Sequence, residues 1–371
     1  MKLTIERSAL LGALGHVQNV VERRNIIPIL SNVQLVADDT GLNVTATDLD
    51  LAMVEAVPAE VQQTGGTTAP ALILHDIVRK LPDGAQVELD SGSEDGRMTV
   101  RAGRSNFALS CLPQEDFPVM AEGDLPHRFA VAAVDLQRLI EKTRFAISTE
   151  ETRYYLNGIY LHAPEGAGVL RGVATDGHRL AHVEIALPDG AATMPGVILP
   201  RKAALEVQKL IEGSAGEVEV ALSDSKIRFT FGEIVLTSKL IDGTFPDYQR
   251  VIPTGNDKVM EVDCKSFSAA VDRVATISSE KSRAVKLAAQ GAAVVLSASN
   301  PEQGSGTDEV AVTFSGEEAL EIGFNARYLL DIAGQIEGEN IIFDLSDGAS
   351  PTIIRDPADS GALYVLMPMR V

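Results

Sequence analysis

The sequence predicts an α+β fold built from three similar domains, each made of two helices packed on an antiparallel sheet. Three observations predict it: two motifs repeat at one common offset along the chain, each repeat carries two stretches with helical periodicity, and short alternating segments separated by turns fill the rest. A chain of 371 residues is long enough for two or three domains. We place three domains at residues 1–125, 126–253 and 254–371.

The repeat is clearest in the first two domains. Thr47-Asp48 returns as Thr175-Asp176, and Phe117-Pro118 returns as Phe245-Pro246, with the same separation in both cases. Two motifs that share one offset are hard to obtain by chance. A third copy appears when the domain starts are aligned by apolar spacing, with a step of two and then five residues: Leu3, Ile5 and Leu10; Phe129, Val131 and Leu136; Met260, Val262 and Phe267.

Each domain opens with a strand and then a helix, because the two-residue step fits one face of a strand and the residues that follow recur at helical spacing. A second helix follows in mid-domain, and Pro, Asn or Gly residues bound it. Short alternating segments such as 87–90, 218–221 and 341–344 predict antiparallel strands. The six predicted helices are 7–24, 72–81, 135–148, 200–212, 264–283 and 326–337.

The composition is that of a globular protein, with 45% hydrophobic and 23% charged residues. The first residues carry an acidic side chain and no apolar signal region, and no uncharged apolar run is long enough to span a bilayer, so we expect a cytoplasmic protein. The two cysteines, Cys111 and Cys264, stand far apart, which indicates neither a disulfide framework nor a zinc knuckle.

Charge is distributed unevenly between the element types. The chain carries a net charge of −20, yet the six predicted helices hold 16 Lys and Arg against 10 Asp and Glu. Because the repeat places the helices on equivalent faces, their charge is expected to collect on one weakly basic surface, which suits loose, sequence-independent contact with phosphates. The alternative is that short helices use Lys and Arg only as solvated helix formers. No signature of base-specific recognition is present.

One cluster of residues suggests an enzyme. Asp176, His178 and His182 combine a carboxylate with two imidazoles, which could bind zinc or act as acid and base. However, Arg179 stands where the helical metalloprotease motif requires Glu, and the segment has the pattern of a strand. Gly304-Ser305-Gly306 lacks the lysine of a phosphate-binding loop. We therefore favour a protein without catalytic activity, metal or cofactor; a metal- or phosphate-dependent enzyme and a protein-binding scaffold without DNA remain alternatives.

Several longer motifs resemble a known family, the β subunits of bacterial DNA polymerase III, which are sliding clamps. The resemblance covers the whole chain and lies in segments 153–158, 174–180, 237–240, 245–248, 300–303 and 364–370. It implies a head-to-tail homodimer whose six domains form a ring, with helices lining the hole. Such a ring encircles duplex DNA, tethers the replicative polymerase and so confers processivity. It performs no chemistry.

The resemblance also implies which residues form the dimer interface and which contact DNA. Phe107 of one subunit and Thr276-Ile277 of the other match the dimer interface of the family. Thr276 is more polar than the aliphatic residue expected there. Arg24 is the strongest candidate for a DNA contact, followed by Arg23 and Lys202.

Finally, the resemblance implies an apolar pocket between the second and third domains that binds short peptide segments of partner proteins. These partners are the replicative polymerase, the clamp loader, translesion polymerases, mismatch repair proteins and ligase. One buried apolar anchor is worth roughly 1.5–3 kcal/mol, which predicts exchangeable binding on the order of micromolar. The matching residues are Leu156, Thr175, Gly177, His178, Arg179, Leu180, Pro246, Arg250, Val251, Tyr328, Val365, Met367, Pro368, Met369 and Arg370. Two departures from the family, Pro351 and Val371, could alter which peptides fit.

Overall fold

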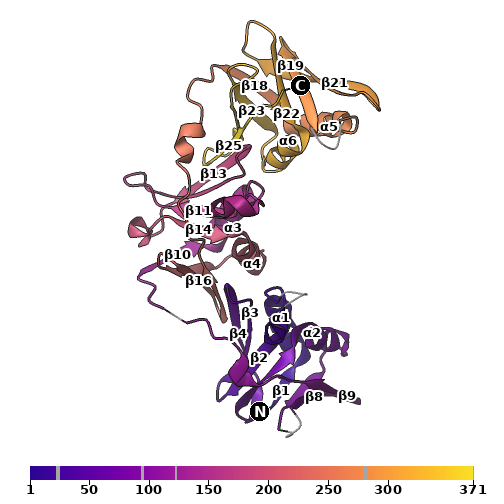
Figure 1. The fold of residues 1–371 in the computed structure, drawn as a ribbon, viewed down its shortest axis with the longest axis vertical. Coiled ribbons are helices and arrows are strands. Elements are labelled where there is room, and N and C mark those ends of the chain that lie inside the picture. The colour runs from indigo at the N-terminus through magenta and orange to yellow at the C-terminus, as the bar shows by residue number, and fades with distance from the viewer. Residues whose placement is uncertain (22–25, 93–95, 122, 279–282, 371) are drawn as a thin grey trace. The chain divides into compact units, whose positions relative to one another are not determined.

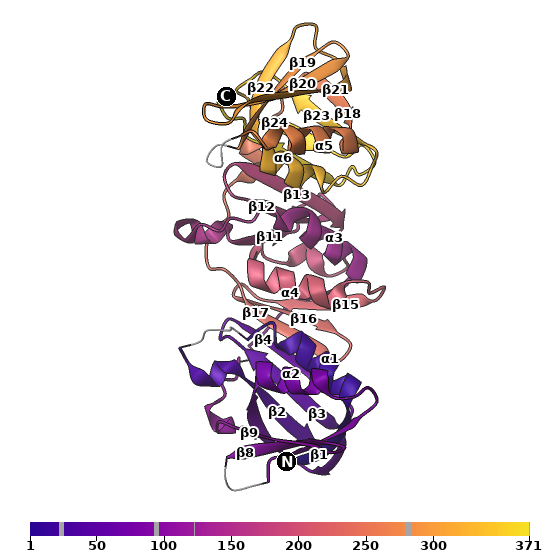
Figure 2. The same cartoon turned by 90° about the vertical axis from the view of Figure 1, so that its right-hand side faces the viewer.

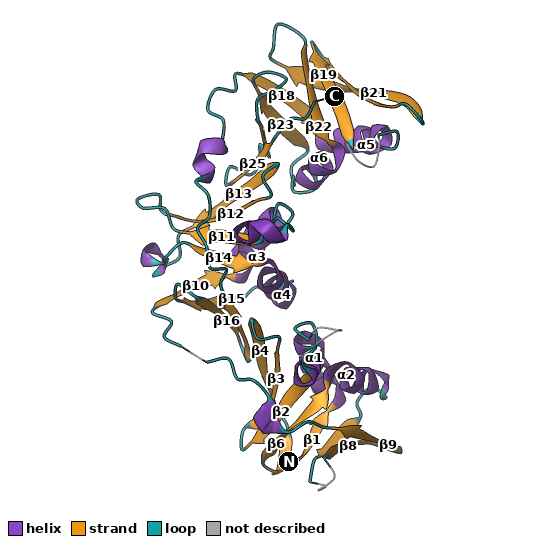
Figure 3. Cartoon of the chain, in the orientation of Figure 1, coloured by secondary structure: helices purple, strands orange, loops and turns teal. Residues whose placement is uncertain are grey.

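The computed structural model describes residues 1–21, 26–92, 96–121, 123–278 and 283–370. Within these ranges the chain contains six α-helices and 25 strands, and every strand ladder is antiparallel. The α+β prediction is thus confirmed (Figure 3). The chain divides into two compact units: residues 1–137, 188–195 and 202–240 form the first, and residues 138–187, 196–201 and 241–371 form the second.

The first unit holds two sheets. The larger one runs in the order β10 (His127–Ala132), β15 (Glu217–Leu222), β16 (Lys226–Phe231), β17 (Ile234–Lys239), β4 (Leu51–Val57), β3 (Gly41–Thr47), β2 (Asn32–Asp38) and β6 (Gly65–Pro70). The smaller one runs in the order β5 (Glu60–Gln63), β1 (Lys2–Glu6), β7 (Gln86–Asp90), β8 (Arg97–Ala102) and β9 (Ser105–Ser110). Helices α1 (Arg7–Val17) and α2 (Ala71–Lys80) pack side by side in this unit (Figures 1 and 2).

The second unit contains one sheet of twelve strands. Their order is β14 (Val197–Pro200), β11 (Gly158–His162), β12 (Val169–Thr175), β13 (Arg179–Ala186), β25 (Ala362–Leu366), β24 (Thr352–Arg355), β23 (Asn340–Leu345), β18 (Lys258–Asp263), β21 (Gly304–Phe314), β20 (Ala293–Asn300), β19 (Ala284–Gln290) and β22 (Leu320–Asn325). Helices α5 (Cys264–Ala275) and α6 (Ala326–Ala333) pack against each other and against its strands (Figure 1). The division into units passes through α3 (Ala133–Arg144) and α4 (Arg201–Ile211).

All six predicted helices are present, but each ends earlier than predicted: α2 and α4 by one residue, α3 and α6 by four, and the first and fifth by more. The predicted helix 7–24 ends at Val17 and the predicted helix 264–283 ends at Ala275. The backbone N–H groups of Val20 and Val21 after α1, and of Thr276, Ile277 and Ser278 after α5, bond to the carbonyl three residues back, which tightens the chain into turns. Beyond Ala275 the hydroxyl groups of Thr276 and Ser278 also donate to helix carbonyls, in competition with the regular helical pattern.

The repeat reappears in the strand pairing. In the first unit β4 pairs with β17, and Met53 lies opposite Leu236. In the second unit β13 pairs with β25, and Ala181 lies opposite Tyr364. Ala181 follows Met53, and Tyr364 follows Leu236, by the same offset that relates Thr47 to Thr175. The two ladders are therefore two copies of one strand pairing. The predicted strand segments 87–90, 218–221 and 341–344 lie within β7, β15 and β23.

The helices bury one apolar face in each unit. In α1 this face consists of Leu10, Ala13, Leu14 and Val17. In α5 it includes Phe267, whose ring centroid lies 5.1 Å from that of Phe343. Among the described helices, none is both long and apolar enough to cross a membrane.

Candidate functional site

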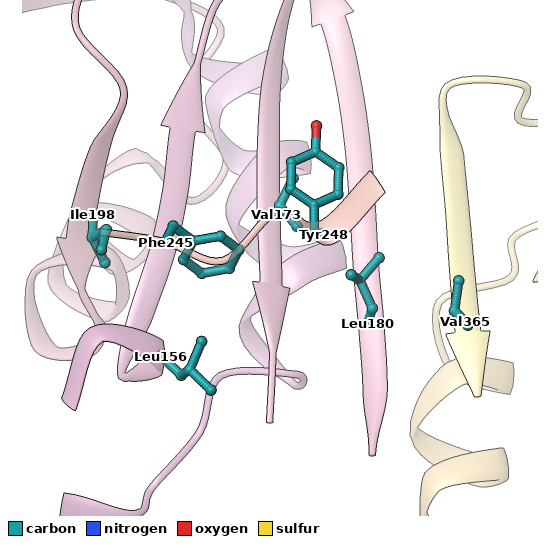
Figure 4. Close-up of a cluster of buried hydrophobic side chains, with 7 residues drawn as sticks. All are labelled: Leu156, Val173, Leu180, Ile198, Phe245, Tyr248 and Val365. Carbon is teal, nitrogen blue, oxygen red and sulfur yellow. The ribbon is translucent and has the colours of Figure 1, made fainter. Parts of the chain in front are cut away.

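A cluster of apolar side chains occupies the second unit, where β13 and β25 pair (Figure 4). Residues that alternate along a strand point to one face of the sheet, and Leu180 of β13 lies directly opposite Val365 of β25. The buried members of the cluster are Leu156, Val173, Leu180, Ile198, Phe245, Tyr248 and Val365. Half-buried side chains packed against it are Tyr155, Tyr160, Ile241, Ile252 and Leu363.

The cluster continues into exposed apolar side chains. Met367 follows β25 directly and is 41% exposed, and its backbone N–H donates to the carbonyl of His178 over 2.9 Å. Tyr154 and Val251 are also exposed, next in sequence to Tyr155 and Ile252 of the cluster. Adjacent exposed apolar groups above a buried cluster are a surface that a peptide can cover.

A tight turn between β12 and β13 shapes one side of this surface. The Asp176 carboxylate accepts hydrogen bonds from the backbone N–H groups of His178 and Arg179. Gly177 has a φ of +86°, and a Cβ on it would lie 2.6 Å from Nη1 of Arg153. A residue other than glycine would therefore be strained and would displace Arg153.

Arg179 connects this turn to more distant parts of the chain. Its Nε donates to Asp176 Oδ2 at 3.1 Å, its Nη1 to Asp331 Oδ2 at 2.5 Å, and its Nη2 to the Phe145 carbonyl at 2.6 Å. The guanidinium carbon lies 4.3 Å from the ring centroid of Tyr328. The ring of Tyr328 in turn stacks on that of His178, with centroids 6.3 Å apart.

A polar layer lies behind Tyr248 of the cluster. The Tyr248 hydroxyl lies 3.0 Å from His162 Nε2 and accepts a hydrogen bond from Arg171 at 2.8 Å, and Arg171 also donates to Glu184. His182 lies 3.6 Å from the same Glu184 carboxylate. Burial, reinforced by the positive charge of Arg171, lowers the pKa of both histidines to about 4.

The structure places Asp176 and His182 of the suggested catalytic cluster in different surroundings. His182 belongs to the layer around Glu184 and Tyr248, whereas Asp176 is bonded within its own turn and to Arg179. In the described part of the chain, no three His, Cys, Asp or Glu side chains are grouped so that they could hold a metal ion.

The predicted pocket residues fall into three groups. Leu156, Leu180 and Val365 belong to the buried cluster. The turn residues Thr175, Gly177, His178 and Arg179 directly precede Leu180 of the cluster; Tyr328 stacks on His178, and Met367 donates its backbone N–H to the His178 carbonyl. The remaining predicted residues lie in the two segments that flank the cluster in sequence: Pro246, Arg250 and Val251 after Phe245, and Pro368, Met369 and Arg370 after Met367.

The sequence prediction missed several buried members of the cluster. Val173, Ile198, Phe245 and Tyr248 were not predicted. Phe245 could have been found, because it belongs to the repeated motif whose first copy contains Phe117. Ile198 reaches the cluster from β14, at the edge of the sheet, and no local pattern indicates this.

The residues predicted to form the dimer interface and to contact DNA are not part of the apolar cluster. Phe107 is 39% exposed on β9, and Thr276 and Ile277 directly follow α5. The Lys202 ammonium donates to the Asp48 carboxylate and to the Val20 carbonyl, so a phosphate would have to share it. Arg23, Arg24 and Val371 lie outside the described residues. Pro351 accepts a hydrogen bond from Asn256 through its carbonyl.

Comparisons with known proteins point to one family over the whole length. Models of the DNA polymerase III beta subunit match residues 1–121 with the N-terminal domain, 130–247 with the central domain and 249–370 with the C-terminal domain. The beta sliding clamp of Caulobacter vibrioides is 55% identical and that of Escherichia coli K12 is 41% identical, both over 100% of each chain.

Solved structures agree with these matches. A sliding clamp from Bartonella birtlesii bound to griselimycin is 50% identical, with a TM-score of 0.97 over 100% of both chains. The beta sliding clamp of Caulobacter crescentus is 55% identical, with a TM-score of 0.97 over 100% of this chain and 99% of that one.

Proposed function

Since the chain belongs to the family of bacterial β sliding clamps, the β subunits of DNA polymerase III, we propose that two copies close head to tail into a ring that tethers its partners to duplex DNA. The chain is a DNA sliding clamp, a processivity factor and not an enzyme, and it works with DNA and DNA polymerase. The ring holds DNA topologically, so each contact with the duplex can be weak enough to permit sliding.

The strand edges support the head-to-tail dimer and are the observation that carries the proposal. Among the described strands, β9 pairs only with β8, which leaves its other edge open. Residues 304–311 of β21 pair with β20 on one side, while β18 pairs only with residues 312–314. An open edge is a template for another strand, and pairing β9 of each copy with β21 of the other would close two copies into a ring.

The repeated ladders support the same pairing. Ala108 of β9, Leu236 of β17 and Tyr364 of β25 follow one another at equal separations, which match the offset of the repeated motifs. Strand β17 pairs with β4, and strand β25 pairs with β13. Strand β9 is the third copy, and among the described strands it has no partner in the equivalent place. We propose that β21 of a second chain supplies it.

DNA would lie against the basic helices. Arg24, Arg23 and Lys202 are the proposed contacts with the phosphate backbone. Their interaction with the duplex is expected to depend on salt and to ignore base sequence.

Short peptide segments of partner proteins would bind the apolar surface around Leu180, Val365 and Met367. We propose the replicative polymerase, the clamp loader, translesion polymerases, mismatch repair proteins and ligase as these partners. An extended peptide can bury two apolar anchors there and exchange readily, because two anchors supply only a few kcal/mol before ordering costs.

Substituting Met367→Ala is expected to weaken the binding of such peptides by about tenfold, chiefly through faster dissociation, because an exposed and adaptable contact surface is lost. Fluorescence anisotropy with labelled peptides measures the effect. Val259→Ala is the matched control, because Val259 is similarly exposed, at 38%, but lies on β18. The Val259→Ala variant should bind the peptides with wild-type affinity. Equal affinity of the Met367→Ala variant and the wild type would remove Met367 from the site.

A further inference from the structure

We infer that Arg179 is a positioning residue of the pocket: its guanidinium group holds Tyr328 and His178 in place for the bound peptide and does not itself bind that peptide. This inference rests on the proposed peptide-binding function. The family resemblance places Arg179 on the pocket wall together with His178 and Leu180. The contacts of its side chain, however, indicate a different role from theirs.

All three nitrogens of the Arg179 guanidinium group donate hydrogen bonds within the protein. Arg179 is 8% exposed, and each of its three side-chain nitrogens donates to another part of the chain: Nε to Asp176, Nη1 to Asp331 and Nη2 to the Phe145 carbonyl. A guanidinium group that turned away to bind a peptide would give up one of these charge-assisted hydrogen bonds.

Two aromatic rings also pack against the Arg179 guanidinium group. The guanidinium carbon lies 4.3 Å from the ring centroid of Tyr328 and 5.1 Å from that of Phe145. Planar guanidinium groups stack on aromatic rings in this way, which an ammonium group on a flexible stem does not reproduce.

The three anchors of Arg179 come from separate segments. Asp176 lies in the β12–β13 turn, Phe145 just after α3, and Asp331 on α6. Tyr328 lies one helical turn before Asp331 on α6, and the ring of His178 stacks on it. Arg179 therefore fixes α6 against the turn, and with it the two pocket side chains that these elements carry.

Positioning and contact have different kinetic consequences. If Arg179 only holds the pocket in its binding-competent arrangement, its loss lowers the fraction of competent molecules, and the association rate falls by that fraction. Once the peptide is bound, its contacts are intact and the dissociation rate is unchanged. Loss of a direct contact acts mainly on the dissociation rate instead.

The test uses the full-length protein and stopped-flow fluorescence with a panel of fluorescein-labelled synthetic octapeptides, each with leucine and phenylalanine two positions apart so that both fall on one face of an extended chain. In Arg179→Lys we expect the association rate constant to fall about tenfold while the dissociation rate constant changes less than about twofold. Asp331→Asn, which keeps the shape of the side chain, should shift the same constant in the same direction. Arg101→Lys is the matched control, because it makes the same substitution on β8 of the first unit, where the Arg101 side chain is 53% exposed; it should retain wild-type kinetics.

A faster dissociation with unchanged association in Arg179→Lys would show that the guanidinium contacts the peptide and would overturn the inference. Wild-type kinetics in both Arg179→Lys and Asp331→Asn would overturn it as well. If the wild-type protein bound none of the peptides, the proposed peptide-binding function would itself fail, which is a different result. Circular dichroism of each variant verifies that it is folded.

Discussion

The Phe107→Asp variant is expected to be monomeric at concentrations at which the wild type is a dimer. The substitution places an unpaired carboxylate on the open edge of β9, where the proposed dimer would bury an aromatic ring. We expect the dimer dissociation constant to rise at least about 100-fold, which corresponds to roughly 3 kcal/mol. Analytical ultracentrifugation over a dilution series measures it.

Val119→Asp is the control for this variant, because Val119 is more exposed than Phe107 and lies outside every described strand. It should dimerise like the wild type. If Phe107→Asp also kept the wild-type dissociation constant, β9 would not be the dimerising edge. The head-to-tail arrangement would then need another pair of surfaces.

Acidification is expected to destabilise the protein through the polar layer behind the pocket. Burial and the nearby Arg171 lower the pKa of His162 and His182 to about 4, against 6.5 for a free imidazole. Well above pH 6.5 both are neutral whether the chain is folded or unfolded. As the pH falls from 6.5 to 4, the unfolded chain takes up protons that the folded chain excludes, so stability is lost across this window.

The expected loss for His182, the more buried of the two, is about 3 kcal/mol over the full window. His162 should contribute less because it is more exposed. The double variant His162→Gln/His182→Gln lacks both titrations and should show a smaller decrease in unfolding free energy between pH 7.5 and pH 5. Urea denaturation of both proteins at the two pH values measures the difference. Equal decreases would mean that these histidines titrate normally in the folded protein.

Much of the fold could be predicted because the chain repeats. One common offset aligned the turn motifs of the first two domains, and the same offset relates the β4–β17 and β13–β25 ladders. The ends of α1 and α5 could not be predicted from apolar periodicity. They are set by tight turns and, after α5, by the hydroxyl groups of Thr276 and Ser278.

The candidate site was only partly predictable, for a physical reason. Family motifs indicated Leu156, Leu180 and Val365, but Ile198 joins them through sheet pairing that no local pattern specifies. The surroundings of Arg179 are equally non-local, since its partner Asp331 lies 152 residues away in the sequence. Family motifs pointed to Arg179, and its surroundings in the structure are the basis on which we propose a positioning role for it.

The most direct test of the clamp is retention on circular DNA. The protein is loaded onto a nicked circular duplex by its cognate clamp loader with ATP, and the amount bound is measured before and after a restriction enzyme linearises the circle. A ring that holds DNA topologically stays on the circle and is lost once free ends exist. Equal retention on the linear form would contradict topological tethering and would indicate direct, tight binding to the duplex.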